Sequence, residues 1–139
     1  MNWNESKPVS DEEIAFYMNF KTFEWVDKEK VRQIVWKSRN VSYLASSVIV
    51  KEGEIADWNV YLIKSWEVEV LVWSLRVATL KQFDIFWEYW VICEEPRTAT
   101  VKALTNIECL VVNWNDLLEL TDYNTALSDT IMDRFFKDQ

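Results

Sequence analysis

The residues of this chain best suited to chemistry are a carboxylate and a guanidinium, Glu88 and Arg97, which stand nine positions apart. Such a pair can clamp a sugar phosphate, because a guanidinium forms paired, charge-assisted hydrogen bonds with phosphate oxygens and a carboxylate accepts from sugar hydroxyls. The indoles of Trp87 and Trp90 stand beside Glu88 and could instead fill the same space. The segment 86–101 therefore predicts either a ligand site or a closed one.

The composition argues against most enzymatic and metal chemistry. The chain has no histidine, and this removes the commonest general base and metal ligand. Cys93 and Cys109 lie far apart and form no CxxC pair, and the aspartates lack metal-ligand spacing. We therefore expect no enzyme, no metal and no cofactor.

The charge and the hydropathy limit the partners and the location. A formal net charge of −8 disfavours binding to nucleic acid, which needs a basic face. The sequence has no run of 18 apolar residues, so we predict no membrane span. The polar N-terminus does not resemble a secretory signal. We expect a cytoplasmic protein.

The length of 139 residues predicts one domain, which we place at 10–139 after a flexible segment over 1–9. Ser10 and Glu13 predict a capping box for a helix over 11–21, and Asp27 predicts the start of a helix over 28–37. From residue 39 to 113 the pattern changes to short, alternating, β-branched segments. Helical spacing returns over 114–137.

Several separated motifs resemble those of the cyclic nucleotide-binding domain, a family that includes regulatory domains of cAMP- and cGMP-dependent kinases, gated channels and bacterial catabolite activators. The resemblance covers about residues 14 to 135. It implies an α+β fold, an antiparallel β-roll (jelly-roll-like, a double-stranded β-helix) with two N-terminal helices, a short cassette helix and C-terminal helices. The matching positions are Ile49, Gly53, Glu54, Tyr61, Ile63, Glu67, Val68, Val70, Asp84, Phe86, Glu88, Pro96, Arg97, Ala99, Thr100 and Val101.

The resemblance also implies roles for the segment that we compare with the family's phosphate-binding cassette. Arg97 matches the arginine that pairs with the cyclic phosphate, and Glu88 matches the glutamate that accepts from the ribose 2′-hydroxyl. Thr98 stands where threonine tends to favour cGMP over cAMP. The other expected ligand-binding residues of the cassette are Trp87, Tyr89, Trp90 and Ala99.

The terminal helix resembles the family's mobile lid, in which an apolar or aromatic residue caps the base. Tyr123, Leu127 and Ile131 are the candidates for that residue. Movement of this helix would signal to a kinase or another effector protein.

The chain departs from the family at positions that normally hold small residues. The family has glycine at Trp66, Phe83 and Trp87, and a small residue at Ser46, at Ala56 and at Trp90. A bulky residue in the left-handed region costs about 1–2 kcal/mol. The backbone at 66, 83 and 87 must therefore differ from the family's, or other contacts must offset the strain.

Two interpretations of function remain open. The first is a non-catalytic sensor of cAMP or cGMP. The second is a degenerate domain of the same fold, whose phosphate pocket is filled by Trp87 and Trp90 and which acts as a structural or protein-interaction module. We expect Trp58, Trp66 and Trp73 to pack in the core or at sheet edges rather than to bind a ligand.

Overall fold

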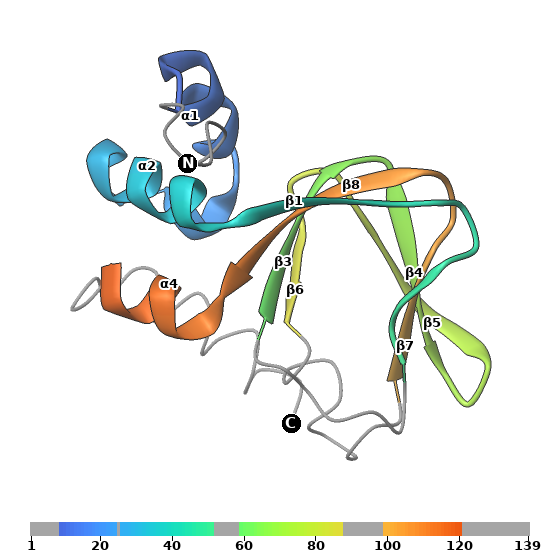
Figure 1. Ribbon diagram of the computed structural model, residues 1–139. Coiled ribbons are helices and arrows are strands. Elements are labelled where there is room, and N and C mark those ends of the chain that lie inside the picture. The colour runs from blue at the N-terminus through green and yellow to red at the C-terminus, as the bar shows by residue number, and fades with distance from the viewer. Residues whose placement is uncertain (1–8, 25, 52–58, 88–98, 121–139) are drawn as a thin grey trace, which may run out of the picture.

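The computed structural model describes residues 9–24, 26–51, 59–87 and 99–120, which form two four-stranded antiparallel sheets and a layer of helices (Figure 1). The helices are α1 (Asp11–Tyr17), the 3-10 helix η1 (Lys21–Phe23), α2 (Lys28–Lys37) and α4 (Trp114–Leu120). The strands are β1 (Arg39–Tyr43), β2 (Val48–Val50), β3 (Asn59–Ser65), β4 (Glu67–Val72), β5 (Leu75–Lys81), β6 (Ile85–Trp87), β7 (Ala99–Ala103) and β8 (Ile107–Asn113).

Local sequence explains where the first helices begin. The Ser10 hydroxyl accepts a hydrogen bond from the Glu13 backbone N–H at 3.1 Å, and the Glu13 carboxylate accepts from the Ser10 N–H at 3.4 Å, which confirms the predicted capping box. The Asp27 carboxylate accepts from the Glu29 N–H at 2.7 Å and caps α2, whose bounds match the predicted helix.

The first helix is shorter than the range 11–21 predicted from its apolar spacing. It ends at Tyr17, and η1 follows after a turn. The side-chain amide of Asn19 donates to the carbonyl oxygens of Ala15 at 3.2 Å and Phe16 at 3.1 Å. These bonds satisfy carbonyls that the end of a helix leaves without intrahelical partners, so the chain can turn here.

The central strands of the first sheet, β8 and β3, are buried on both faces. The strand order of this sheet is β1-β8-β3-β6. In β3, Val60 and Leu62 pack with the helices, whereas Tyr61 and Ile63 point into the interior of the roll. Because successive residues of a strand face opposite sides, a nearly continuous apolar run is what a doubly covered sheet requires.

The second sheet, with strand order β2-β7-β4-β5, is buried on its inner face only. Val68 and Val70 of β4 pack in the interior of the roll, and the alternate residue Glu67 is exposed. The outermost strand β5 is exposed along most of its length. Together the two sheets enclose one apolar interior, as the predicted β-roll requires.

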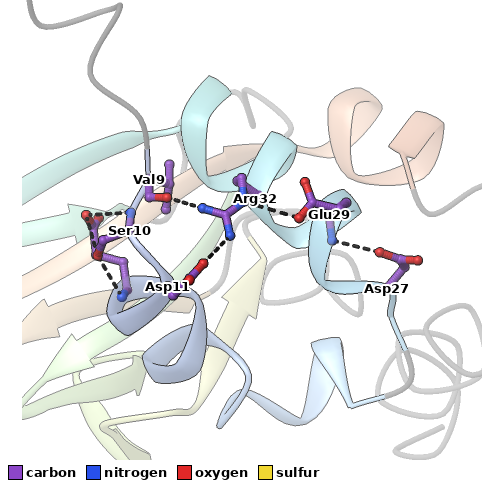
Figure 2. A network of polar contacts seen from close by, with 7 residues as sticks. Val9, Ser10, Asp11, Asp27, Glu29 and Arg32 are labelled. Carbon is purple, nitrogen blue, oxygen red and sulfur yellow. Dashed lines mark hydrogen bonds and ion pairs between the residues drawn. The ribbon is translucent and has the colours of Figure 1, made fainter.

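An arginine joins the two N-terminal helices. Figure 2 shows the Arg32 guanidinium of α2 donating to the carbonyl oxygen of Val9 and to the carboxylate of Asp11 at 2.6 Å. Its Nε also pairs with the Glu29 carboxylate at 3.5 Å. The start of α1 is therefore tied to the middle of α2, and both helices cover the same face of the first sheet (Figure 1).

Candidate functional site

The segment 88–98, which holds the predicted site, joins the two sheets. The strand before it, β6, is at the edge of the first sheet, and Trp87 pairs there with Val60 of β3. The strand after it, β7, is inside the second sheet, and Ala99 pairs with Val72 of β4. Glu88 directly follows β6, and Arg97 comes two residues before β7. The strands that flank the segment thus belong to separate sheets.

The roll interior holds these two attachment points firmly. The ring of Phe86 stacks on the ring of Tyr61 with centroids 4.7 Å apart and planes within 3° of parallel. Ala99 and Val101 are buried in the same apolar cluster. A stacked, buried aromatic pair adds to the energy of burial alone. The residues that flank the segment on both sides are therefore packed in the apolar interior of the roll.

Most of the sequence-predicted site residues lie outside the part that the structure describes. Among them Ala99 alone has a described side chain, and this residue is 2% exposed and packs in the core. The residues outside the described ranges are Glu88, Tyr89, Trp90, Arg97, Thr98, Tyr123, Leu127 and Ile131, as is the side chain of Trp87.

At two of the positions where the family has glycine and this chain has a bulky residue, the backbone has the conformation that favours glycine. Trp66 has φ 66° and Phe83 has φ 73°, both in the left-handed region. Ser46, where the family has a small residue, has φ 71°. The chain therefore retains these turn conformations and tolerates the strain. Trp87, in contrast, belongs to strand β6, which the alternating pattern did not predict.

The packing expectation for the exposed tryptophans was wrong. Trp66 is 66% exposed and Trp73 is 73% exposed. Each lies at a turn, Trp66 between β3 and β4 and Trp73 in the two-residue turn that joins β4 to β5. Trp73 and Ser74 both have positive φ, of 54° and 67°, as a type I′ hairpin turn requires. Turn geometry here directs the indoles outward.

A polar cluster on the helix-facing side of the first sheet was not predicted. The Lys64 ammonium donates to the Asn40 side-chain oxygen at 2.7 Å and pairs with the Glu108 carboxylate at 3.3 Å. It also lies 5.5 Å from the centre of the Tyr17 ring. A buried tyrosine and a lysine at the sheet margin, separated by 47 positions, give no local sequence signal.

The electrostatics of this cluster follow from partial burial. Burial raises the pKa of Tyr17, although the hydrogen bond to Lys64 opposes the shift. Burial lowers the pKa of Lys64, but the hydrogen bond and charge of Tyr17 and the carboxylate of Glu108 outweigh it, so its pKa rises. Lys64 therefore stays charged and links α1 to the sheet.

The described residues suggest neither a metal centre nor a membrane helix. Within the described ranges no three histidine, cysteine, aspartate or glutamate side chains gather to hold a metal ion. No helix in the same ranges has the length and apolar character needed to cross a bilayer. Cys109 is free and buried, and its burial raises the thiol pKa to about 12.

Comparisons with known families agree with this architecture. Residues 40–124 match a family model described as the cyclic nucleotide-binding domain. The cGMP-dependent protein kinase of Plasmodium berghei is 30% identical over 101 residues, which are 72% of this chain and 12% of the kinase. The chain spans between 8% and 20% of the length of the curated relatives it matches.

Solved structures share the fold at low sequence identity. The sensor domain of the transcriptional regulator DNR from Pseudomonas aeruginosa aligns with a TM-score of 0.74 and 15% identity, over 89% of this chain and 86% of the other. The regulatory domain of Toxoplasma gondii PKA with cAMP aligns with a TM-score of 0.72 and 18% identity, over 87% of this chain and 47% of the other. The predicted α+β fold built on a β-roll is therefore confirmed.

Proposed function

Because the chain belongs to the cyclic nucleotide-binding domain family, we propose that it is a non-catalytic regulatory domain that binds cAMP or cGMP at the segment 88–98. The observation that carries the proposal is the attachment of this segment, with β6 pairing to β3 of one sheet and β7 pairing to β4 of the other. Glu88 and Arg97 stand next to these two attachment points in the sequence. A clamp works best when both arms are fixed before the ligand arrives.

In this proposal Arg97 neutralises the cyclic phosphate through a two-pronged guanidinium contact, and Glu88 accepts from the ribose hydroxyl. The hydroxyl of Thr98 favours cGMP, because it can reach the guanine amino group. Tyr89, Trp87, Trp90 and the backbone of Ala99 complete the contacts. The polar contacts fix the orientation of a ligand, while the apolar interior of the roll supports them.

Ligand binding would change the position of the C-terminal helix. One of Tyr123, Leu127 and Ile131 would cover the base and change the balance between two positions of that helix. A kinase or another effector protein would respond to the change. The relatives motivate this choice of effector, because they include a cGMP-dependent protein kinase and a regulatory subunit of cAMP-dependent protein kinase, and the matched region is only a small part of each.

Calorimetric titration with cAMP and with cGMP tests the proposal. We expect saturable binding, and stabilisation of about 2.7 kcal/mol when the free ligand is one hundred times its Kd. Arg97→Ala should abolish binding, whereas Arg39→Ala, which removes an exposed arginine on the opposite edge strand of the first sheet from β6, should not. Thr98→Ala should weaken the binding of cGMP and leave the affinity for cAMP unchanged. Absence of binding by either nucleotide at millimolar concentration refutes the proposal.

The alternative is that the pocket is closed and binds no nucleotide. The tryptophans at 87 and 90, where the family has small residues, favour it. The domain would then be a structural or protein-interaction module. The double variant Trp87→Gly/Trp90→Ala separates the two cases. If the natural chain binds no cyclic nucleotide and the double variant binds one, the indoles fill the pocket. If both proteins bind, the alternative is wrong.

A further inference from the structure

One continuous stretch of this acidic chain contains basic residues and no acidic ones. The whole chain has 23 Asp and Glu against 15 Lys and Arg, yet residues 30–51 include five Lys or Arg and no Asp or Glu. This stretch forms most of α2, then β1 and β2. A local excess of positive charge in a chain of net charge −8 is a candidate contact surface.

Helix α2 places several of these residues on its solvent side. Its inner face is formed by Val31, Ile34 and Val35, which are buried against the helical layer and the first sheet. Lys30, Gln33 and Lys37 are all exposed and lie three and four positions apart, so they form one stripe about 10 Å long. The helix thus presents a basic outer stripe.

An indole borders this stripe. Trp36 is 54% exposed on α2, one position before Lys37. Exposed arginine Arg39 follows at the start of β1. We call Lys30, Gln33, Trp36, Lys37 and Arg39 the α2 basic surface. Tryptophan is enriched among the residues that dominate binding energy at protein interfaces.

The charges of this surface are available to a partner. Lys30, Lys37 and Arg39 form no ion pair with any residue in the described part of the chain. The neighbouring Arg32 and Glu29 differ, because they pair with each other and Arg32 also holds Asp11 and the Val9 carbonyl (Figure 2). Arg32 is thus engaged in contacts among the N-terminal helices, whereas Lys30, Lys37 and Arg39 face solvent.

We propose that the α2 basic surface docks an acidic segment of a partner protein that presents an apolar side chain to Trp36. Carboxylates would pair with Lys30, Lys37 and Arg39, and the apolar side chain would cover the indole. A nucleic acid or an anionic membrane fits less well, since its many charges extend past the surface and meet the acidic remainder of the chain. This docking is separate from nucleotide binding.

The test uses the full chain and a short fluorescein-labelled peptide of glutamates around a central phenylalanine, followed by fluorescence anisotropy. We expect saturable binding that weakens with added salt. Lys30→Glu/Lys37→Glu should weaken it by about ten-fold or more, because two attractive pairs become repulsive. The control Lys21→Glu/Lys81→Glu makes the same change of net charge at exposed lysines elsewhere and should alter the affinity by less than about two-fold.

The indole is tested with a second peptide that has alanine in place of the phenylalanine. The natural chain should bind the phenylalanine peptide more tightly, and Trp36→Ala should remove that difference. Three outcomes overturn the proposal: no saturable binding at millimolar peptide, equal weakening in the two lysine variants, or tighter binding to a single-stranded oligonucleotide or to phosphatidylserine vesicles than to the peptide.

Discussion

The ring of Phe83 meets the ring of Phe20 edge to face at 5.3 Å and 87°, although the backbone of Phe83 has φ 73°. The same ring lies 5.3 Å from that of Phe16. The backbone N–H of Phe83 also donates to the carbonyl oxygen of Ile63 at 2.9 Å. A residue in a conformation that favours glycine is therefore held by aromatic packing and by a backbone hydrogen bond.

Trp66 has the same left-handed backbone without comparable burial, so glycine at the two positions should act in opposite directions. Trp66→Gly should raise the free energy of unfolding by about 1 kcal/mol, because relief of strain exceeds the added entropy of the unfolded glycine. Phe83→Gly should lower it by about 2 kcal/mol, through the lost aromatic contacts. Urea unfolding of both variants measures the difference. Equal changes of the same sign would contradict this account.

The turn between β4 and β5 leads to a second prediction. A type I′ turn favours Asn-Gly, and here Trp73 and Ser74 occupy it with positive φ. Trp73→Asn/Ser74→Gly should stabilise the protein by about 1 kcal/mol or more, because both residues then suit the conformation. Thr79→Gly, in the extended backbone of β5, should instead destabilise it by about 0.5–1 kcal/mol. Thermal unfolding of the two variants makes the comparison, and destabilisation by the turn variant would refute it.

Sequence patterns predicted the sheets better than the turns, for a physical reason. Alternation and β-branching are local, so short strands could be predicted over 39–113, and the structure confirms them in elements such as β3 and β8. The left-handed backbone of Trp66 could not be read from its residue type, since tryptophan disfavours it. The three-residue strand β6 is too short to show a period.

The candidate site could be predicted only through its motif. Glu88 and Arg97 were selected by type and order, and the structure adds the attachment of their segment to both sheets. The Lys64 cluster had no such signal, because its members come from α1, β1, β3 and β8 and meet only when the chain is folded. Long-range polar contacts of this kind need a structure.

A buried hydroxyl supports a third prediction. Thr22 in η1 is 3% exposed, and its Oγ1 has no hydrogen-bond partner among the described residues. Thr22→Val keeps the shape and removes the unsatisfied group, so the free energy of unfolding should rise by about 1 kcal/mol. Thr79→Val, the same substitution at an exposed position, should change it by less than about 0.5 kcal/mol. Guanidinium unfolding curves give both values, and a loss of stability in Thr22→Val would show that the hydroxyl is satisfied.

The last prediction concerns Cys109, which packs in the roll interior and whose thiol pKa is raised from 9.0 to about 12 by burial and by the nearby Glu108 carboxylate. Above pH 9 the unfolded thiol loses its proton while the folded thiol keeps it, so stability falls as the pH rises toward 12. The slope attributable to this thiol is about 1.4 kcal/mol per pH unit.

Stability should therefore be measured from pH 8 to 10.5 in a Cys93→Ser background, with and without Cys109→Ala. The protein that retains Cys109 should lose stability more steeply above pH 9, since tyrosine ionisation is common to both and cancels. In the same background Ellman's reagent should react with Cys109 only after denaturant is added. Parallel pH curves, or rapid reaction of the folded protein, would show that the thiol is exposed to solvent.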